Sequence, residues 1–300
     1  MMKVKDDEVD ILERIRAMRL QEEKAARCKN YLTPEVDASC RKAMVDWCFV
    51  ICDILGLSRE TVGIAFSILD RYLSSDNGKL SSKALRNKQT FQLAATTCLF
   101  VAVKLHEPTL LGIDLLIKLC RGYYTEKNIL AMEQDILESL EYRIYLTISA
   151  PMEYVRHFLE LLGSEFADVS DVIHENALKY LNSASSDIYF STCRSSAIGV
   201  ACLAGALNDT WSLSSLEKDA MWRQLSRKLD FDIASKEIRK VELQLLAESD
   251  TTCEPKRESQ TRLPRTSVNK ARARDASPVS VNVDLAPRGL RFPQLVRQVA

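Results

Sequence analysis

Apolar residues recur at helical spacing along most of the chain. The run Gln89–Glu107 is the most apolar of these stretches, because only four of its side chains between Phe91 and Leu105 are polar. A helix that is apolar on nearly every side belongs inside a bundle, with other helices packed around it. A membrane span needs about 20 apolar residues. The glutamine, two threonines and lysine of this run therefore favour a central bundle helix over a membrane span.

Capping signals divide the first half of the chain into helices. Asp6–Arg27 is charged with one apolar stripe, which predicts a helix that docks on a neighbour. Thr33 followed by Pro34 predicts a helix start, and Gly56 predicts its end. Ser58 and Thr125 are predicted caps of later helices. After the N-terminal helix, the predicted helices span about 34–55, 58–73, 89–107, 112–120 and 126–140.

A second series of five helices follows the extended linker Tyr142–Ser149. These helices are predicted at Pro151–Leu162, Val169–Ser186, Thr192–Leu207, Ser214–Lys228 and Ala234–Ala247. The third of them is apolar all round, like the central helix of the first series, and follows it by about 100 residues, which predicts a duplicated five-helix unit.

The predicted fold class is all-α, because strand signals are nearly absent. The expected divisions are an N-terminal helix and linker (1–33), a first five-helix unit (34–146), a second unit (147–249) and a tail (250–300). Periodicity stops beyond Asp250, and the tail is rich in Ser, Thr, Pro, Arg and Lys, which predicts disorder.

Composition narrows the function classes. No signal-peptide pattern occurs, so we expect an intracellular protein. The nine cysteines are odd in number and mostly sit in apolar runs, which favours reduced thiols. Without CxxC, and with three scattered histidines, we expect neither a metal site nor a cofactor. Residues 251–300 hold ten Lys/Arg and four Asp/Glu, leaving 31 and 37 in residues 1–250. The mildly acidic body gives no reason to expect direct nucleic-acid binding.

Two charged residues of the first unit fall on apolar faces. Asp70 lies between Phe66 and Leu73 near a helix C-terminus, where the helix dipole disfavours an anion. Arg41 precedes apolar positions on the buried side of its own helix. A buried carboxylate needs a partner, and arginine offers a bidentate match. We predict an internal Arg41–Asp70 ion pair; the alternative is that both side chains reach solvent at helix ends.

Lys104 and Glu133 are a second pair of misplaced charges. Lys104 sits in the last turn of the central helix, and Glu133 lies between Ile129 and Leu137 inside an apolar stripe. The two could neutralise each other, which would make them structural. Alternatively, both could stand at the edge of the bundle and bind the backbone of a partner, which would make them functional. Helix geometry alone leaves both alternatives open.

Four segments together resemble the cyclin box, in that family's order and spacing. They are RKAMVDW (Arg41–Trp47), ILDRYLS (Ile68–Ser74), FQLAATTCLFVAVKLHE (Phe91–Glu107) and AMEQDILESLEYRI (Ala131–Ile144). The resemblance covers roughly residues 10–248. The second half, with APMEYVRHFLELLG (Ala150–Gly163), is most similar to D-type cyclins. The resemblance implies two tandem cyclin-box bundles.

The resemblance also implies roles. Arg41 and Asp70 match the family's internal ion pair, and Lys104 and Glu133 match the pair that contacts a cyclin-dependent protein kinase. The chain would then be a regulatory subunit that activates such a kinase, with G1/S-type cell-cycle control implied by the D-type likeness. Kinases require an inward helix αC, and a cyclin favours that state by binding it. We therefore expect no enzymatic activity of its own.

A substrate-docking groove for RxL-type peptides is implied at a third place. Its matching positions are Met44, Trp47, Phe91 and Gln92, together with Cys40 and Ala43, which are smaller than the family's usual residues. Val50 replaces the acidic residue that receives the peptide's arginine, which removes a contact of about 1.5–3 kcal/mol. The alternative is that Met44 and Trp47 are simply core residues.

The basic tail carries three short patterns. Lys256-Arg257 and Lys270–Arg274, twelve residues apart, resemble a bipartite nuclear-import signal, so we expect a nuclear protein that also occurs in the cytoplasm. A solvated basic tail is the alternative. Ser277-Pro278 is a candidate phosphorylation site. Arg288–Phe292 has the form RxLxF of a cyclin-docking peptide and could occupy this chain's own groove.

Two rival functions are weighed against the kinase regulator. A transcription factor IIB-like or transcriptional scaffold also uses two such units, but it would bind DNA. This chain has no N-terminal zinc ribbon, and its body is acidic where phosphate contacts need lysine and arginine. An enzyme is disfavoured because the sequence holds no Gly-rich phosphate loop, no HExxH and no GxSxG.

Overall fold

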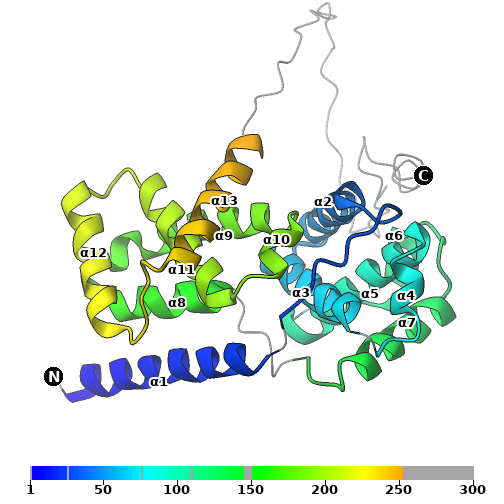
Figure 1. Cartoon of the computed structure of the whole chain (residues 1–300), viewed down its shortest axis with the longest axis horizontal. Helices are drawn as coiled ribbons and strands as arrows, with labels where there is room; N and C mark the ends of the chain where they lie inside the picture. The colour runs from blue at the N-terminus through cyan, green and yellow to red at the C-terminus, as the bar shows by residue number, and fades with distance from the viewer. Residues whose placement is uncertain (1, 26, 76, 109–110, 145–150, 253–300) are drawn as a thin grey trace, which may run out of the picture.

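The structure, a computed structural model, describes residues 2–25, 27–75, 77–108, 111–144 and 151–252 (Figure 1). The regular secondary structure of these residues is entirely helical, as the sequence predicts. None of the described helices is both long and apolar enough to cross a membrane. The predicted boundary at 146/147 and the tail patterns (Lys256–Arg274, Ser277-Pro278 and Arg288–Phe292) lie outside the described residues.

The first group of helices packs around one hydrophobic cluster. Its members are α2 (Ala38–Leu55), α3 (Glu60–Ser74), α4 (Ser81–Ala84), α5 (Lys88–His106), α6 (Ile113–Leu119) and α7 (Glu126–Ser139). α5 is the central helix and contacts α2, α3, α4 and α7. Its side chains from Phe91 to Val103 are buried all round except Leu93, because neighbours cover every face of it.

The second group repeats this order around a second hydrophobic cluster. Its members are α8 (Pro151–Leu162), η2 (Ser164–Phe166), α9 (Ala167–Ala184), α10 (Ile188–Ser191), α11 (Ser195–Asp209), α12 (Ser215–Lys228) and α13 (Lys236–Thr252). α11 is central and contacts α8, α9 and α13. In Figure 1 this group lies on the left and α2–α7 lie on the right. Each group has a four-residue helix, α4 or α10, that the periodicity did not predict.

The N-terminal helix α1 (Met2–Lys24) docks mainly on α8 of the second group (Figure 1). Ile15 is 1% exposed within the second cluster. The Arg19 guanidinium lies 4.1 Å from the centre of the Phe231 ring. Glu22 accepts a hydrogen bond of 2.6 Å from the Ser196 backbone N–H, at the start of α11. The apolar stripe of α1 is therefore completed by residues far along the chain.

The start of α2 corrects one prediction. We expected Thr33 to cap a helix beginning at Pro34, but α2 begins at Ala38 and the Asp37 carboxylate caps it, accepting from Cys40 N–H at 3.0 Å. The Thr33 hydroxyl caps only a local turn, accepting from the Val36 N–H and donating to the Leu85 carbonyl. The Gly56 end and the Thr125 cap are confirmed.

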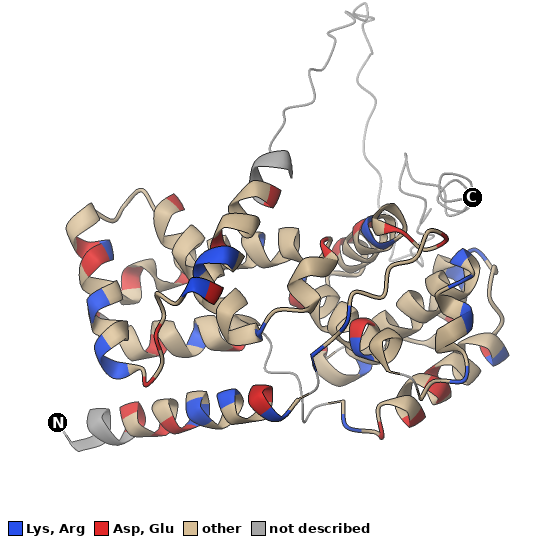
Figure 2. Cartoon of the chain, in the orientation of Figure 1, with Lys and Arg blue, Asp and Glu red and all other residues tan. Residues whose placement is uncertain are grey.

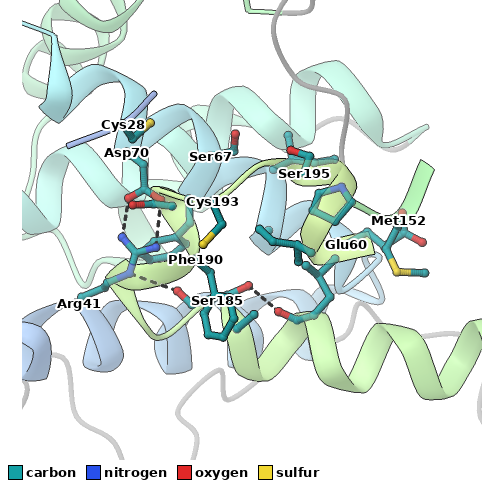
Figure 3. A pocket seen from close by; sticks show the side chains of 18 residues that line it. Cys28, Arg41, Glu60, Ser67, Asp70, Met152, Ser185, Phe190, Cys193 and Ser195 are labelled. Carbon is teal, nitrogen blue, oxygen red and sulfur yellow. Dashed lines mark hydrogen bonds and ion pairs between the residues drawn. The ribbon is translucent and has the colours of Figure 1, made fainter. Parts of the chain in front are cut away.

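The two groups meet mainly where α3 packs against α9. Glu60 on α3 accepts two hydrogen bonds, of 2.9 and 3.1 Å, from the Arg156 guanidinium on α8. A cavity of about 120 Å3 lies at this junction (Figure 3). Ile188 of α10 is buried in the first cluster, so the second group contributes a side chain to the core of the first.

Candidate functional site

Arg41 on α2 and Asp70 on α3 form a buried ion pair. The two guanidinium nitrogens Nη1 and Nη2 lie 2.5 and 3.0 Å from the two carboxylate oxygens, and the side chains are 2% and 6% exposed. Tyr31 joins the pair, because its hydroxyl donates to Asp70 at 2.7 Å and accepts from Arg41 at 2.6 Å. Arg41 Nε also donates to the Ser185 carbonyl, at the end of α9, over 3.2 Å (Figure 3).

Burial governs the protonation of this cluster. Burial, and then the charge of Asp70, raises the pKa of Tyr31 well above its ordinary value, so its hydroxyl keeps its proton. Burial alone would lower the pKa of Arg41. The negative charge of Asp70 and the hydrogen bonds that Arg41 donates to Asp70 and Tyr31 raise it instead. Through these hydrogen bonds the cluster joins α2 to α3, to the segment that precedes α2 and to the end of α9 in the second group.

Lys104 and Glu133 contact each other at the surface. Lys104 Nζ, in the last turn of α5, donates to Glu133 Oε1 on α7, and it lies 4.4 Å from the centre of the Phe100 ring. The Lys104 side chain is 36% exposed and that of Glu133 is 13% exposed. The two side chains therefore neutralise each other, as the first alternative requires, and they do so at the edge of the bundle. Binding to the backbone of a partner, the second alternative, stays a prediction.

The four predicted groove residues are all buried. Met44 is 1% exposed, Trp47 6%, Phe91 0% and Gln92 3%. The Gln92 side-chain oxygen accepts from the Tyr124 hydroxyl over 3.4 Å inside the protein. This burial agrees with the alternative interpretation, in which Met44 and Trp47 are core residues. A docking groove at these residues stays a prediction, and a peptide there would meet only the edges of their side chains.

Residues 13–145 match the family model "Cyclin, N-terminal domain". This part of the chain is a cyclin N-terminal domain. It contains both ion pairs and the whole of the first group of helices. The cyclin resemblance seen in the sequence is therefore confirmed, and the buried Arg41–Asp70 pair and the partly exposed Lys104–Glu133 pair both lie within this cyclin domain.

Individual cyclins resemble the chain at modest identity. G1/S-specific cyclin-D1 of Pongo abelii is 28% identical over 229 residues, which is 73% of this chain and 72% of the relative. Cyclin-A2-2 of Arabidopsis thaliana is 24% identical over 157 residues, or 52% of this chain, and G1/S-specific cyclin-E1 of Danio rerio is 26% identical over 146. The chain spans 34% of the length of each of these last two relatives.

The cyclin fold extends beyond the N-terminal domain. The X-ray structure of a viral cyclin from herpesvirus saimiri superposes with a TM-score of 0.60 at 18% identity, covering 77% of this chain and 96% of that chain. A likeness at this identity concerns the fold alone. It agrees with the all-α fold and with the two successive groups of helices predicted from the sequence.

One buried acid of the cyclin domain was missed by the sequence reasoning. Asp135 on α7 is 6% exposed and accepts three hydrogen bonds, from the Tyr72 hydroxyl at 2.6 Å and from the Lys79 and Leu80 N–H groups at 2.9 Å. It fastens the start of α4 to α7. A partial signal was present, because Asp135 lies one helical turn after the apolar Met132, as Asp70 lies one turn after Phe66.

The described residues contain no group of three or more His, Cys, Asp or Glu side chains arranged to hold a metal ion. Their eight cysteines are free thiols. Burial raises the pKa of Cys48 and Cys98 well above the ordinary value, so these thiols stay protonated.

Proposed function

We propose that this chain is a regulatory subunit that binds and activates a cyclin-dependent Ser/Thr protein kinase through Lys104 and Glu133. The observation that carries the proposal is the position of this ion pair at the surface of a cyclin N-terminal domain. Ion pairs that reach solvent contribute only about 0–1 kcal/mol to stability, and the Lys104 end of this pair is 36% exposed. A pair of this kind explains little about the fold and is free to exchange partners.

The pair has hydrogen-bonding capacity left over. An ammonium group has three donors and a carboxylate accepts at both oxygens. Only one bond joins Lys104 to Glu133, and neither side chain has another hydrogen bond in the described part of the chain. A partner backbone can supply what is missing, with carbonyl groups for Lys104 and N–H groups for Glu133.

An apolar side chain flanks the pair. Leu130 precedes Glu133 by three residues on α7, which places both on one face of that helix, and it is 46% exposed. Interfaces combine a desolvated apolar part with charges that fix orientation. A kinase that covers Leu130 would also remove water from the Lys104–Glu133 pair and strengthen its bonds.

Activation follows from differential binding. A kinase is active only when helix αC lies inward, so that its glutamate pairs with the β3 lysine. A subunit that binds the αC-in state more tightly shifts the kinase toward it. The regulatory subunit needs no catalytic residue for this purpose. We further place the chain in cell-cycle control of the G1/S type, on the basis of its likeness to cyclin-D1, and in the nucleus, on the basis of its basic tail.

Charge reversal separates kinase binding from a structural role. Lys104→Glu and Glu133→Lys should each abolish capture of a kinase from lysate of the source cell, and each should change the free energy of unfolding by less than about 1 kcal/mol. The double reversal restores the internal attraction but presents the wrong charges to a partner. We expect it to fold like the unchanged protein and still to fail in capture.

The chain offers a matched control. Lys79 pairs with Glu138 at 3.0 Å, and Glu138 lies on α7 like Glu133. Lys79→Glu should leave kinase capture unchanged. The proposal is wrong if the double reversal regains capture, because the pair would then act only within the chain. It is also wrong if Lys79→Glu is as damaging as Lys104→Glu.

A further inference from the structure

A cleft of about 420 Å3 lies where α1 ends, between the two groups of helices. The segment after α1 forms one wall, α3 and the end of α7 form a second, and the residues from Ser191 to Ser195 before and at the start of α11 form a third. Figure 2 shows Lys and Arg positions where the segment after α1 passes between the two groups. No feature of the kinase-binding proposal uses this cleft.

Positive charge gathers in the cleft. Its lining includes four basic residues, Arg27, Lys29, Arg71 and Arg194, against two acidic ones, Glu22 and Glu141. Residues 1–250 as a whole have more acidic than basic residues. The excess of cations in the cleft is therefore local, and it would attract an anion to a protein body that otherwise repels one.

Arg71 lacks an anionic partner. Its guanidinium donates to the carbonyls of Arg143 and Ile144, at 2.9 and 3.4 Å, and no carboxylate among the described residues pairs with it. Burial lowers the pKa of Arg71, whereas the equally charged Arg41 has Asp70 against it. A partly buried cation without a counterion is costly, and an anion entering the cleft would remove that cost.

Arg27 and Arg194 are only loosely neutralised. Both approach the same carboxylate, that of Glu237, and they do so at 3.6 and 4.0 Å. These distances exceed those of a charge-assisted hydrogen bond, which are about 2.7–2.9 Å. The two side chains are 55% and 32% exposed. Their donors therefore stay available to a ligand that offers several acceptor oxygens.

Hydroxyl groups complete the lining. Ser67 on α3 and Ser195 at the start of α11 both line the cleft, and their hydroxyls make no hydrogen bond in the described part of the chain. Figure 3 shows the two side chains at the edge of the adjoining cavity, which they also line. Arginines together with serine hydroxyls are suited to tetrahedral oxyanions, because both donate to several oxygens at once.

We propose that this cleft binds the phosphate of a phosphorylated serine or threonine in a partner protein. A phosphomonoester carries about −1.5 to −2 charges at pH 7 and three acceptor oxygens, which matches the excess of cations better than a single carboxylate does. The volume has room for roughly a dozen water-sized groups, so residues flanking the phosphate fit as well. A nucleic acid requires a row of phosphate contacts, and the acidic body around the cleft disfavours that.

Calorimetric titration of the full chain tests the proposal. The probes are the blocked peptide Gly-Ala-phosphoserine-Ala-Gly, the same peptide without phosphate, inorganic phosphate and a single-stranded DNA 12-mer. We expect binding of the phosphopeptide and none of the unphosphorylated peptide. Arg71→Gln and Arg27→Glu should each weaken phosphopeptide binding at least tenfold. Lys42→Glu, on α2, where Lys42 pairs with Asp46 on the same helix, should leave it unchanged.

The titrations contain no kinase, so their outcomes test the phosphate cleft independently of the proposed kinase binding. Equal binding of both peptides, or unchanged binding by both arginine variants, overturns the proposal. If inorganic phosphate binds and the phosphopeptide does not, the ligand is not a phosphorylated protein. If the DNA 12-mer binds more tightly than the phosphopeptide, the ligand is a nucleic acid and the proposal is wrong. If circular dichroism shows that Arg71→Gln is unfolded, the double variant Arg27→Glu with Arg194→Gln replaces it. Both of these side chains reach the surface, so the double variant should fold and should lose phosphopeptide binding. Kinase capture by these variants should equal that of the unchanged protein.

Discussion

The central helices α5 and α11 occupy the same place in their groups but are packed by different means. α5 has no glycine, and bulky side chains such as Phe91 and Phe100 cover its faces. α11 has two glycines at which neighbours come close. A Cβ at Gly199 would lie 2.8 Å from the Pro151 carbonyl oxygen, and one at Gly205 would lie 2.6 Å from the Tyr180 ring. The backbone of α11 thus approaches α8 and α9 more closely.

The two groups also differ in their buried charges. Arg41, Asp70 and Asp135 are buried in the first group, whereas Ser196 and Thr210, both uncharged, are the buried polar residues of the described part of the second. Buried charges need particular partners, but close packing needs only particular shapes. Buried ion pairs and hydrogen bonds therefore hold the first group together, whereas close packing of a helix backbone against side chains holds the second.

The largest effect should come from breaking the charge pair of the first group. Asp70→Ala leaves Arg41 buried without a counterion, which should lower the free energy of unfolding by about 3–5 kcal/mol. Fluorine NMR of 5-fluorotryptophan protein in urea can locate the loss, because Trp47 is in the first group and Trp222 packs against the second cluster.

We expect the Trp47 signal to shift its midpoint and the Trp222 signal to shift less. Arg41→Met combined with Asp70→Leu should regain most of the stability, since apolar replacements leave no buried charge. If the urea midpoints of both signals shift by the same amount, the two groups unfold as one unit. The different packing of the two groups would then make no difference to their stability.

A smaller effect should come from the close packing of the second group. Gly199→Ala places a methyl group against a backbone oxygen that cannot easily move, which should cost about 1–3 kcal/mol. Gly63→Ala on α3 is the matched control, because a Cβ there would make only ordinary contacts at 4.0 Å. It should be neutral or stabilise by roughly 0.5–1 kcal/mol through helix propensity. Equal losses from both variants would argue against the closer approach of α11.

The smallest effect concerns the cap of α2. The hydrogen bonds that Ser39 and Cys40 donate hold the pKa of Asp37 at about 2, below the ordinary aspartate value of about 3.9 in the unfolded chain. This contribution is fully present above the unfolded pKa and is lost as pH falls through the folded pKa. Asp37→Ala should cost about 1 kcal/mol at pH 7.

The measurement is urea unfolding of Asp37→Ala and of the unchanged chain at several pH values. The difference between them should shrink as pH falls from about 4 toward 2. A difference that stays constant over this range would contradict the assignment of Asp37 as an ionised cap. Lys42→Ala, which changes a charge on the same helix without touching the cap, is the control.

Much of the candidate site could be predicted because its residues violate a local pattern. Asp70, Lys104 and Glu133 are charges at helical positions where apolar residues are expected, and this is visible without coordinates. Asp135 was overlooked because it is apolar-flanked on one side only, with Glu138 and Ser139 one turn further on. The cleft could not be predicted, because Arg27, Arg71 and Arg194 are each unremarkable on their own segments and converge only when α1 and α11 are packed.

The sequence by itself determined the longer helices, their buried faces, their order in two series and the positions of the misplaced charges, because periodicity and capping depend on residues within a few positions of each other. Tertiary structure alone decided that Lys104 meets Glu133, that α1 lies on the second group, and that Met44 and Phe91 are covered. Those outcomes depend on contacts between residues tens to hundreds of positions apart, such as Glu22 with Ser196. Helical periodicity carries no information on such distances.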